Sequence, residues 1–136
     1  NCSRIVPRGV RSLLRDEPYD FGDRDDGSTR LDFLHIRDMT GAYIRVAEQM
    51  DVAQGEAFNF GRGQPVSTSE IAGLLSRCFD GHQRTPLFHG APRSVPVIKY
   101  LDISKAQRML GWQPQTPLDQ GLSETLAWYR EHLSAL

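Results

Sequence analysis

The sequence has 136 residues, which fits one domain or a large part of one. Hydrophobic residues make up 39% and charged residues 24%, and this composition excludes a disordered, collagen-like or mucin-like chain. The 16 basic and 17 acidic side chains give a net charge of −1, which argues against a nucleic-acid-binding or membrane-surface protein.

Targeting and redox features indicate a cytoplasmic protein. The apolar runs are too short to span a bilayer, and no charged segment followed by an apolar one marks a signal peptide. Cys2 and Cys78 lie far apart in the sequence, and Cys78 falls on an apolar helical stripe. Such usage favours free thiols in a reducing, cytoplasmic setting over a disulfide framework.

The first part of the chain predicts a helix, a loop and a strand. Pro7 suits a first helical turn, and Glu17-Pro18 ends the helix. The polar, glycine-containing segment 20–29 is expected to be a loop, and the alternating segment 31–36 a strand. The helical stripe is formed by Val6, Val10, Leu13 and Leu14.

A second helix and a short strand are expected next. Asp38 is the expected N-cap of this helix, and the break comes at 51–55. The segment 57–60 then predicts a short strand. The stripe expected to face a core consists of Met39, Ala42, Tyr43, Val46, Ala47 and Met50.

The third helix has the clearest local signature. Ser67 and Glu70 have the spacing of a capping box, in which hydroxyl and carboxylate each accept a hydrogen bond from the other residue's backbone N–H. Gly81 is expected to end the helix. Its buried stripe is expected to be Ile71, Leu74, Leu75 and Cys78.

The remaining segments complete an α/β pattern. A strand is expected over 86–89, an irregular loop over 90–96, and a short helix from Asp102 to Gly111. Its inward side chains would be Ile103, Ala106 and Leu110, and those of a last helix opening at 116–119 would be Leu118, Leu122, Leu126, Tyr129 and Leu133. We therefore expect short strands interleaved with helices.

Several patterns resemble sites without meeting their requirements. The Gly61-Arg62-Gly63 turn has Val66 where a dinucleotide loop needs its third glycine, which favours an ordinary glycine turn. The acidic segment 23–26 lacks the spacing of a calcium loop, because Phe33 stands at the position of the last ligand. The histidines share no metal-ligand spacing, and no serine lies in a nucleophile elbow.

Four segments, taken in order, resemble the carboxy-terminal part of one family. They are 29–38 (TRLDFLHIRD), 56–63 (EAFNFGRG), 100–114 (YLDISKAQRMLGWQP) and 121–129 (GLSETLAWY). These are similar to conserved segments of NAD-dependent nucleotide-sugar epimerases and dehydratases, which are extended short-chain dehydrogenase/reductases. The resemblance implies that residues 1–136 form a single carboxy-terminal, substrate-binding portion of an extended Rossmann-type protein.

The resemblance also implies what the chain lacks. The family's amino-terminal half carries the glycine-rich NAD-binding loop and a catalytic Tyr-x-x-x-Lys pair. Neither occurs here, because Tyr100 and Lys105 are five positions apart and belong to another segment. We therefore expect no catalytic residue in this chain, no NAD or NADP bound by the chain alone, and no turnover by it. Because the first residue is Asn1 rather than methionine, we expect a longer protein.

The resemblance assigns three candidate substrate-binding residues. Arg30 and Arg93 would bind the diphosphate of a nucleotide sugar, since a planar guanidinium pairs with phosphate oxygens. Leu31 and Ala91 stand where the family has its arginines, so both contacts depend on a shifted position. The alternative for each arginine is a solvated surface charge. Asn59 would contact the sugar or cofactor, or else bond the neighbouring loop.

Two functions follow from these observations. The first is the nucleotide-sugar-binding part of an NAD(P)-dependent epimerase or 4,6-dehydratase, which is not catalytic on its own. The alternative is a stand-alone small α/β module, or gene remnant, that binds a partner or nucleotide without catalysis. For the first function we expect an exposed apolar patch, and with it a homo-oligomer or association through that patch, whereas a monomer would favour the stand-alone module.

Overall fold

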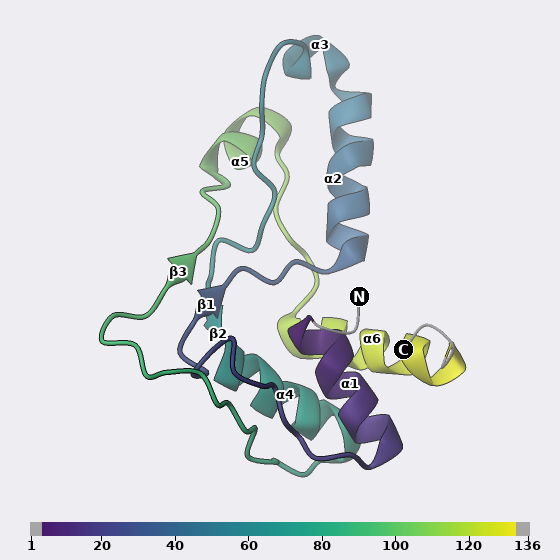
Figure 1. Cartoon of the computed structure of the whole chain (residues 1–136). Coiled ribbons are helices and arrows are strands. Elements are labelled where there is room, and N and C mark those ends of the chain that lie inside the picture. The colour runs from purple at the N-terminus through teal and green to yellow at the C-terminus, as the bar shows by residue number, and fades with distance from the viewer. Residues whose placement is uncertain (1–3, 133–136) are drawn as a thin grey trace.

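The computed structural model describes residues 4–132, so Cys2 and Leu133 lie outside the described part of the chain. Helices and short strands follow one another along the chain (Figure 1). The elements are α1 (Ile5–Arg15), β1 (Arg30–Leu31), α2 (Ile36–Glu48), α3 (Met50–Ala53), β2 (Val66–Ser67), α4 (Thr68–Asp80), β3 (Ile98–Lys99), α5 (Ser104–Leu110) and α6 (Leu118–Glu131). This composition confirms the expected α/β class.

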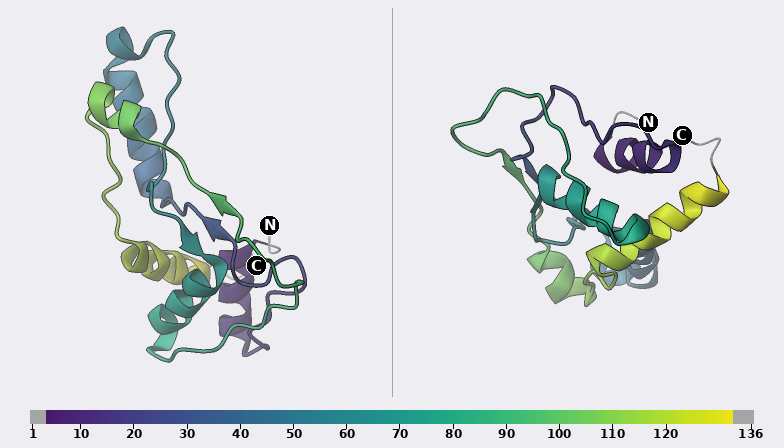
Figure 2. Two further views of the ribbon diagram at one scale, coloured as in Figure 1. Left: turned by 90° about the vertical axis from the view of Figure 1, so that its left-hand side faces the viewer. Right: turned by 90° about the horizontal axis from the view of Figure 1, so that it is seen from below.

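The elements form a helical layer and a projecting arm (Figures 1 and 2). Helices α1, α4 and α6 pack together in the layer, whereas α2, α3 and α5 form the arm. The three strands lie between these two parts, in the order β2-β1-β3. Strand β1 pairs antiparallel with β2 and parallel with β3.

Each part has its own hydrophobic core. The core of the layer consists of Val10, Leu13, Tyr19, Phe21, Ile71, Ala72, Leu75, Leu122 and Leu126. The core of the arm is smaller and consists of Ala42, Ala53, Ile103, Ala106, Leu110 and Trp112. The inward residues predicted for α1, α4, α5 and α6 supply most of the buried hydrophobic side chains, which confirms the helical periodicity used to find them.

The predicted strands are mostly wrong. Only Leu31 of the expected strand 31–36 lies in β1, and the carboxylate of the next residue, Asp32, accepts the backbone N–H groups of Arg62 and Gly63 at 2.8 and 3.1 Å. The segment 57–60 has no strand pairing, and 86–89 contributes only a single bridge, at Leu87. The described strands are therefore only two residues long, shorter than the alternating patterns predict.

The capping box of α4 is formed as predicted. The Ser67 hydroxyl accepts from the backbone N–H of Glu70 at 3.0 Å, and the Glu70 carboxylate accepts from the backbone N–H of Ser67 at 2.8 Å. Gly81 ends the helix in the left-handed conformation, with φ of 82°. Gly111 likewise ends α5, although this helix begins two residues after Asp102.

The start of α2 differs from the prediction. The N-cap is His35, whose ring accepts from the backbone N–H of Arg37, and Asp38 lies in the first turn. The Asp38 carboxylate instead accepts from the backbone N–H groups of Gln115 and Thr116 at 3.1 and 3.0 Å. It thus ties the arm to the segment that enters α6.

The predicted inward stripe of α2 is only partly right. Ala42 is fully buried and Val46 half-buried, but Tyr43 is 68% exposed and Met50 54% exposed. The small core of the arm covers only one side of α2, and no other described element covers the opposite side. The exposed large apolar side chains of α2 and α3 are Ile36, Tyr43, Ile44, Met50 and Val52.

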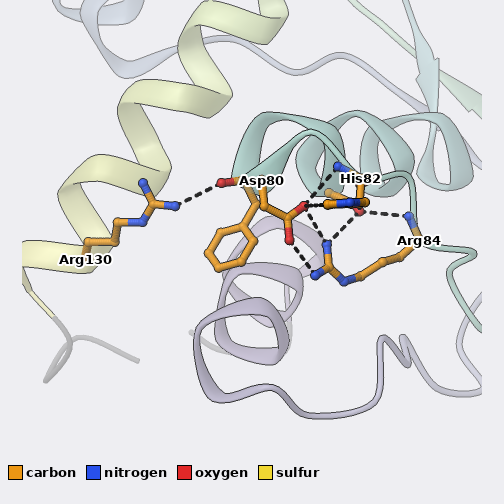
Figure 3. A network of polar contacts seen from close by, with 6 residues as sticks. Asp80, His82, Arg84 and Arg130 are labelled. Atoms are coloured by element: carbon orange, nitrogen blue, oxygen red, sulfur yellow. Dashed lines mark hydrogen bonds and ion pairs between the residues drawn. The ribbon is translucent and has the colours of Figure 1, made fainter.

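An ion-pair network closes the end of α4 (Figure 3). The Asp80 carboxylate accepts from both terminal nitrogens of Arg84, at 2.7 and 3.0 Å, and from the backbone N–H of His82 at 3.0 Å. Arg130 of α6 donates to the Phe79 carbonyl at 3.1 Å and lies over the Phe79 ring. The network therefore joins α4, the segment after it and α6.

This network predicts a loss of stability in acid. The Arg84 hydrogen bonds hold the pKa of Asp80 well below its ordinary value of 3.8. Because the folded-state pKa is lowered, the stabilisation is complete above about pH 5 and disappears as the pH falls through the folded-state value. Urea unfolding should show Asp80→Asn less stable than the wild type at pH 7, with the difference shrinking towards about pH 2. A difference independent of pH would contradict the prediction, and Asp51→Asn on α3 is the control.

Within residues 4–132, no helix is both long enough and apolar enough to cross a membrane. The same residues contain no group of three or more His, Cys, Asp or Glu side chains that could hold a metal ion.

Candidate functional site

A cleft opens beside α1, between its first turns and the loops that precede β1 and β3. Its volume is about 350 Å³. The lining residues are Ile5 and Arg8 of α1, Phe21, Asp23, Arg24 and Asp25 of the first loop, Thr68 at the start of α4, and Phe88. Apolar side chains and arginines therefore meet in one cleft, and we call it the α1 cleft.

The floor of the α1 cleft is aromatic. Phe21 and Phe88 stack with ring centroids 5.1 Å apart and planes at 19°. Their segments are held side by side, because Phe21 N–H donates to the Leu87 carbonyl at 2.8 Å and Leu87 N–H donates to the Tyr19 carbonyl at 2.9 Å. A stacked aromatic pair offers a flat apolar surface of the kind on which a nucleobase can rest.

Arginines bring positive charge to the α1 cleft. Arg8 donates to the Phe21 carbonyl at 3.0 Å and lies 3.7 Å from the Asp20 carboxylate, so its guanidinium is fixed against the aromatic floor. Arg24 lines the same cleft, and its carbonyl accepts from the Arg93 guanidinium at 3.4 Å. The Arg8 guanidinium, fixed in this way, can pair with phosphate oxygens without much further ordering.

The loop beneath Arg93 is held by aspartates. The Asp26 carboxylate accepts a hydrogen bond from the Ser28 hydroxyl at 2.6 Å and another from the backbone N–H of Arg93 at 2.7 Å. These hydrogen bonds lower the pKa of Asp26 to about 2, and the one from the Ser28 hydroxyl has the largest effect. Asp25 accepts from the hydroxyls of Thr29 and Thr68, which fixes the loop to the start of α4.

The three residues predicted to bind substrate do not meet in one place. Arg93 lies beside the α1 cleft, next to Arg24. Arg30 in β1 donates to the Pro65 carbonyl at 2.9 Å and pairs with Glu70 at 3.3 Å. Asn59 donates to the Asp102 carbonyl at 3.3 Å, near the arm. No hydrogen bond among residues 4–132 joins any two of the three.

The sequence reasoning missed most of the α1 cleft. Arg8 lies within the first predicted helix, and Phe21 and Arg24 lie in the segment 20–29 that is expected to be a loop. The available signal was an aromatic residue in each of two segments, at 21 and 88, with arginines near the first. It was weak because the two segments are far apart in the sequence.

The Gly61-Arg62-Gly63 turn does not fit a dinucleotide. A pyrophosphate needs the backbone N–H groups of such a turn as donors. Here the N–H groups of Arg62 and Gly63 both donate to the Asp32 carboxylate, which occupies the place of an anion. These two donors of the turn are therefore engaged within the chain.

Comparison with known proteins shows which sequences this chain is similar to. No model of a known protein family matches the sequence. A probable GDP-L-fucose synthase 1 from Oryza sativa subsp. japonica is 36% identical over 79% of this chain, and a dTDP-4-dehydro-6-deoxy-D-allose reductase from Streptomyces sp. is 32% identical over 97%. The chain spans 31% and 39% of the length of these relatives.

Solved structures with a similar fold come from the same group of enzymes. The crystal structure of UDP-glucuronic acid 4-epimerase from Bacillus cereus in complex with UDP-glucuronic acid and NAD superposes with a TM-score of 0.81 at 24% identity. The match covers 97% of this chain and 41% of that one. The chain therefore belongs to the NAD-dependent nucleotide-sugar epimerases and dehydratases of the extended short-chain dehydrogenase/reductase type, and corresponds to their carboxy-terminal part.

Proposed function

We propose that this chain is the nucleotide-sugar-binding part of an NAD(P)-dependent epimerase or dehydratase, and that the α1 cleft receives the nucleotide. The observation that carries the proposal is the stacked Phe21–Phe88 floor between arginines of α1 and of the first loop. A nucleoside diphosphate needs this combination of a flat apolar surface and fixed cations. The binding of UDP-glucuronic acid by the Bacillus cereus epimerase, which has the same fold, supports it.

The proposal gives each candidate residue a role. Arg93, beside the cleft, would bind the diphosphate together with Arg24. Arg30 stays a predicted phosphate ligand, which would have to exchange its contact with Glu70 for one with the phosphate. Asn59 stays a predicted sugar contact. The chain's own residues bind and orient the substrate, whereas the hydride transfer would use NAD or NADP held by another part of the protein.

The proposal predicts charge-dependent binding by the chain. Calorimetry with UDP, GDP and uridine should show each diphosphate binding at least about tenfold more tightly than the uncharged nucleoside, because the guanidiniums pair with phosphate. Arg93→Ala and Arg24→Ala should each weaken UDP binding, and reduce its dependence on salt. Arg45→Ala on α2, which lies away from the cleft, is the matched control.

The outcomes test the proposed nucleotide site. Loss of affinity in the cleft variants but not in Arg45→Ala supports the α1 cleft as that site. Equal affinity in all variants, or no binding of either diphosphate, would contradict it. Arg30→Ala and Asn59→Ala complete the series, and unchanged affinity in either would make that residue a structural one.

Association through an apolar patch is a further part of the proposal. The exposed apolar side chains of α2 and α3 provide the surface, since contiguous exposed apolar groups favour association in water. Light scattering at increasing concentration should show self-association of the chain. Tyr43→Lys, which places a charge on this surface, should reduce it, and a monomeric wild-type chain at high concentration would contradict the prediction.

A further inference from the structure

A histidine–aspartate pair joins the two segments that form the floor of the α1 cleft. The Nε2 atom of His89 lies 2.9 Å from the Oδ2 atom of Asp20. The backbone N–H of His89 also donates to the Gly22 carbonyl at 2.8 Å, so side chain and main chain hold the same two segments together. Because Asp20 precedes Phe21 and His89 follows Phe88, the pair is tied to both stacked rings.

The same carboxylate faces an arginine of the cleft. The Oδ1 atom of Asp20 lies 3.7 Å from Nη2 of Arg8, and it accepts from the backbone N–H of Gly22 at 2.6 Å. The Nη1 atom of Arg8 donates to the Phe21 carbonyl at 3.0 Å, and Arg8 lines the α1 cleft. Three side chains are therefore coupled in a row, and we call them the Arg8–Asp20–His89 cluster.

Proton uptake by His89 changes the charge of this cluster and keeps its hydrogen bond. Hydrogen bonds, first that of the His89 side chain and then that of the Gly22 N–H, hold the pKa of Asp20 below its ordinary value of 3.8. An ionised carboxylate only accepts, so Nε2 of His89 carries a proton whether the ring is neutral or charged. The second proton enters at Nδ1, and the side chain is 56% exposed, so water can supply it.

The charge of His89 decides how far Asp20 cancels the charge of Arg8. With a neutral ring, one carboxylate faces one guanidinium, and the cluster has no net charge. With a protonated ring, two cations share one carboxylate, and the cluster carries a net positive charge beside the cleft. An imidazole is the side chain whose charge ordinarily changes between about pH 5 and 8.

The other charged groups around the cluster are of a different kind. The cleft is also lined by Asp23, Arg24 and Asp25, which are carboxylates and a guanidinium. The hydroxyls of Thr29 and Thr68 engage Asp25. The segment 86–90 carries no charged side chain besides the imidazole of His89. Among the residues that line the cleft or belong to the cluster, His89 is therefore the histidine.

We propose that His89 is a positioning residue that makes nucleotide-sugar binding in the α1 cleft tighter as the pH falls, by drawing the Asp20 carboxylate's charge away from Arg8. This inference rests on the proposed nucleotide site. An Arg8 guanidinium that is less compensated by Asp20 attracts a diphosphate more strongly, because the local charge opposite the phosphates is more positive. His89 acts through Asp20 and needs no contact with the ligand.

The first test follows the binding of UDP-glucose as the pH is lowered. Its diphosphate is esterified at both ends, so the ligand itself does not titrate in this range. In calorimetry with the chain, the affinity should rise at least about threefold from about pH 8 to about pH 5.5. His89→Gln, which keeps a donor for Asp20 but stays neutral, should remove the rise. His82→Gln is the matched control, because His82 also pairs with an aspartate, Asp80 at 3.4 Å, at the end of α4 (Figure 3).

The second test uses the unsubstituted chain. Nuclear magnetic resonance can follow the ring protons of His89 through a pH titration, with and without UDP-glucose. Because coupling between two binding events is reciprocal, the ligand should move the midpoint of the His89 titration to higher pH, by about half a pH unit for a threefold change in affinity. The midpoint of the His82 titration should not move.

Each outcome decides the inference. A rise in affinity in the wild type and in His82→Gln but not in His89→Gln, with a shifted His89 midpoint, supports it. Affinity independent of pH, a rise that persists in His89→Gln, or an unmoved midpoint would overturn it and leave the nucleotide site in place. No binding of UDP-glucose at any pH would overturn the nucleotide site and this inference with it. Circular dichroism verifies folding, and if His89→Gln does not fold or bind, the midpoint decides.

Discussion

Replacing Asp38 by alanine is expected to lower the free energy of unfolding by about 3–5 kcal/mol, more than any other single polar substitution considered for this chain. Asp38 is only 6% exposed. It accepts three hydrogen bonds, from the backbone N–H groups of Gln115 and Thr116 and from the Thr116 hydroxyl, at 3.0 to 3.1 Å. Alanine would leave these donors without an acceptor where water has little access, and each buried unsatisfied donor costs about 1–3 kcal/mol.

Urea unfolding followed by circular dichroism measures this effect. Asp38→Asn keeps the shape and one acceptor oxygen, so it should lose about half as much stability as Asp38→Ala. Asp51→Ala is the control, because Asp51 is an exposed aspartate in a first helical turn and accepts no such bonds. A loss below about 1 kcal/mol in Asp38→Ala would show that water replaces the carboxylate.

Asp38 also shows where sequence reasoning stops. An aspartate before an apolar helical stripe has the pattern of an N-cap, yet the cap is His35, three residues earlier. The partners of Asp38 lie 77 and 78 positions away in the sequence, so no local pattern could reveal them. By contrast, the partners Ser67 and Glu70 of the capping box are local, and that box is formed as the sequence predicts.

The distinction between local and long-range partners also explains why the strands and the α1 cleft could not be predicted from the sequence. The helices of the layer were predictable because each buries a stripe that recurs every three or four residues. The strands are two residues long and depend on pairing among segments far apart, such as Arg30 with Ser67 and with Ile98. The α1 cleft likewise needs Phe21 and Phe88 to meet, which only the tertiary structure provides.

The family resemblance predicted more about this chain than the hydrophobic periodicity did, but it did not predict the contacts of single side chains. It predicted the relationship to the epimerases and dehydratases, which the comparisons confirm. It assigned Arg30 by its neighbourhood in the sequence, whereas the structure engages that side chain with Glu70 and Pro65. A resemblance identifies a segment more safely than the contacts of one side chain, because a shift of one residue in a strand turns the side chain to the other face.

Gly90→Ala is expected to separate the two loops that form one wall of the α1 cleft. Gly90 donates its N–H to the Asp25 carbonyl at 3.0 Å, and a Cβ at this position would overlap the backbone of Asp25. Backbone cannot turn aside as a long side chain can, so one loop must move. Asp25 lines the cleft and its neighbour Asp26 holds Arg93, and the displacement should therefore reach both the cleft and the arginine.

The expected result is a loss of about 2 kcal/mol in the free energy of unfolding, from the strain and the broken contacts, together with weaker binding of UDP by the chain. Gly41→Ala is the matched control, because a Cβ at this position in α2 meets no atom within 4 Å. It should stabilise the chain by about 0.5–1 kcal/mol, since alanine has the higher helix propensity, and leave UDP binding unchanged. Normal stability in Gly90→Ala would show that the two loops move apart without cost. Normal stability combined with lost UDP binding would place the loops in recognition alone, whereas lost stability with unchanged UDP binding would remove this wall from the nucleotide site.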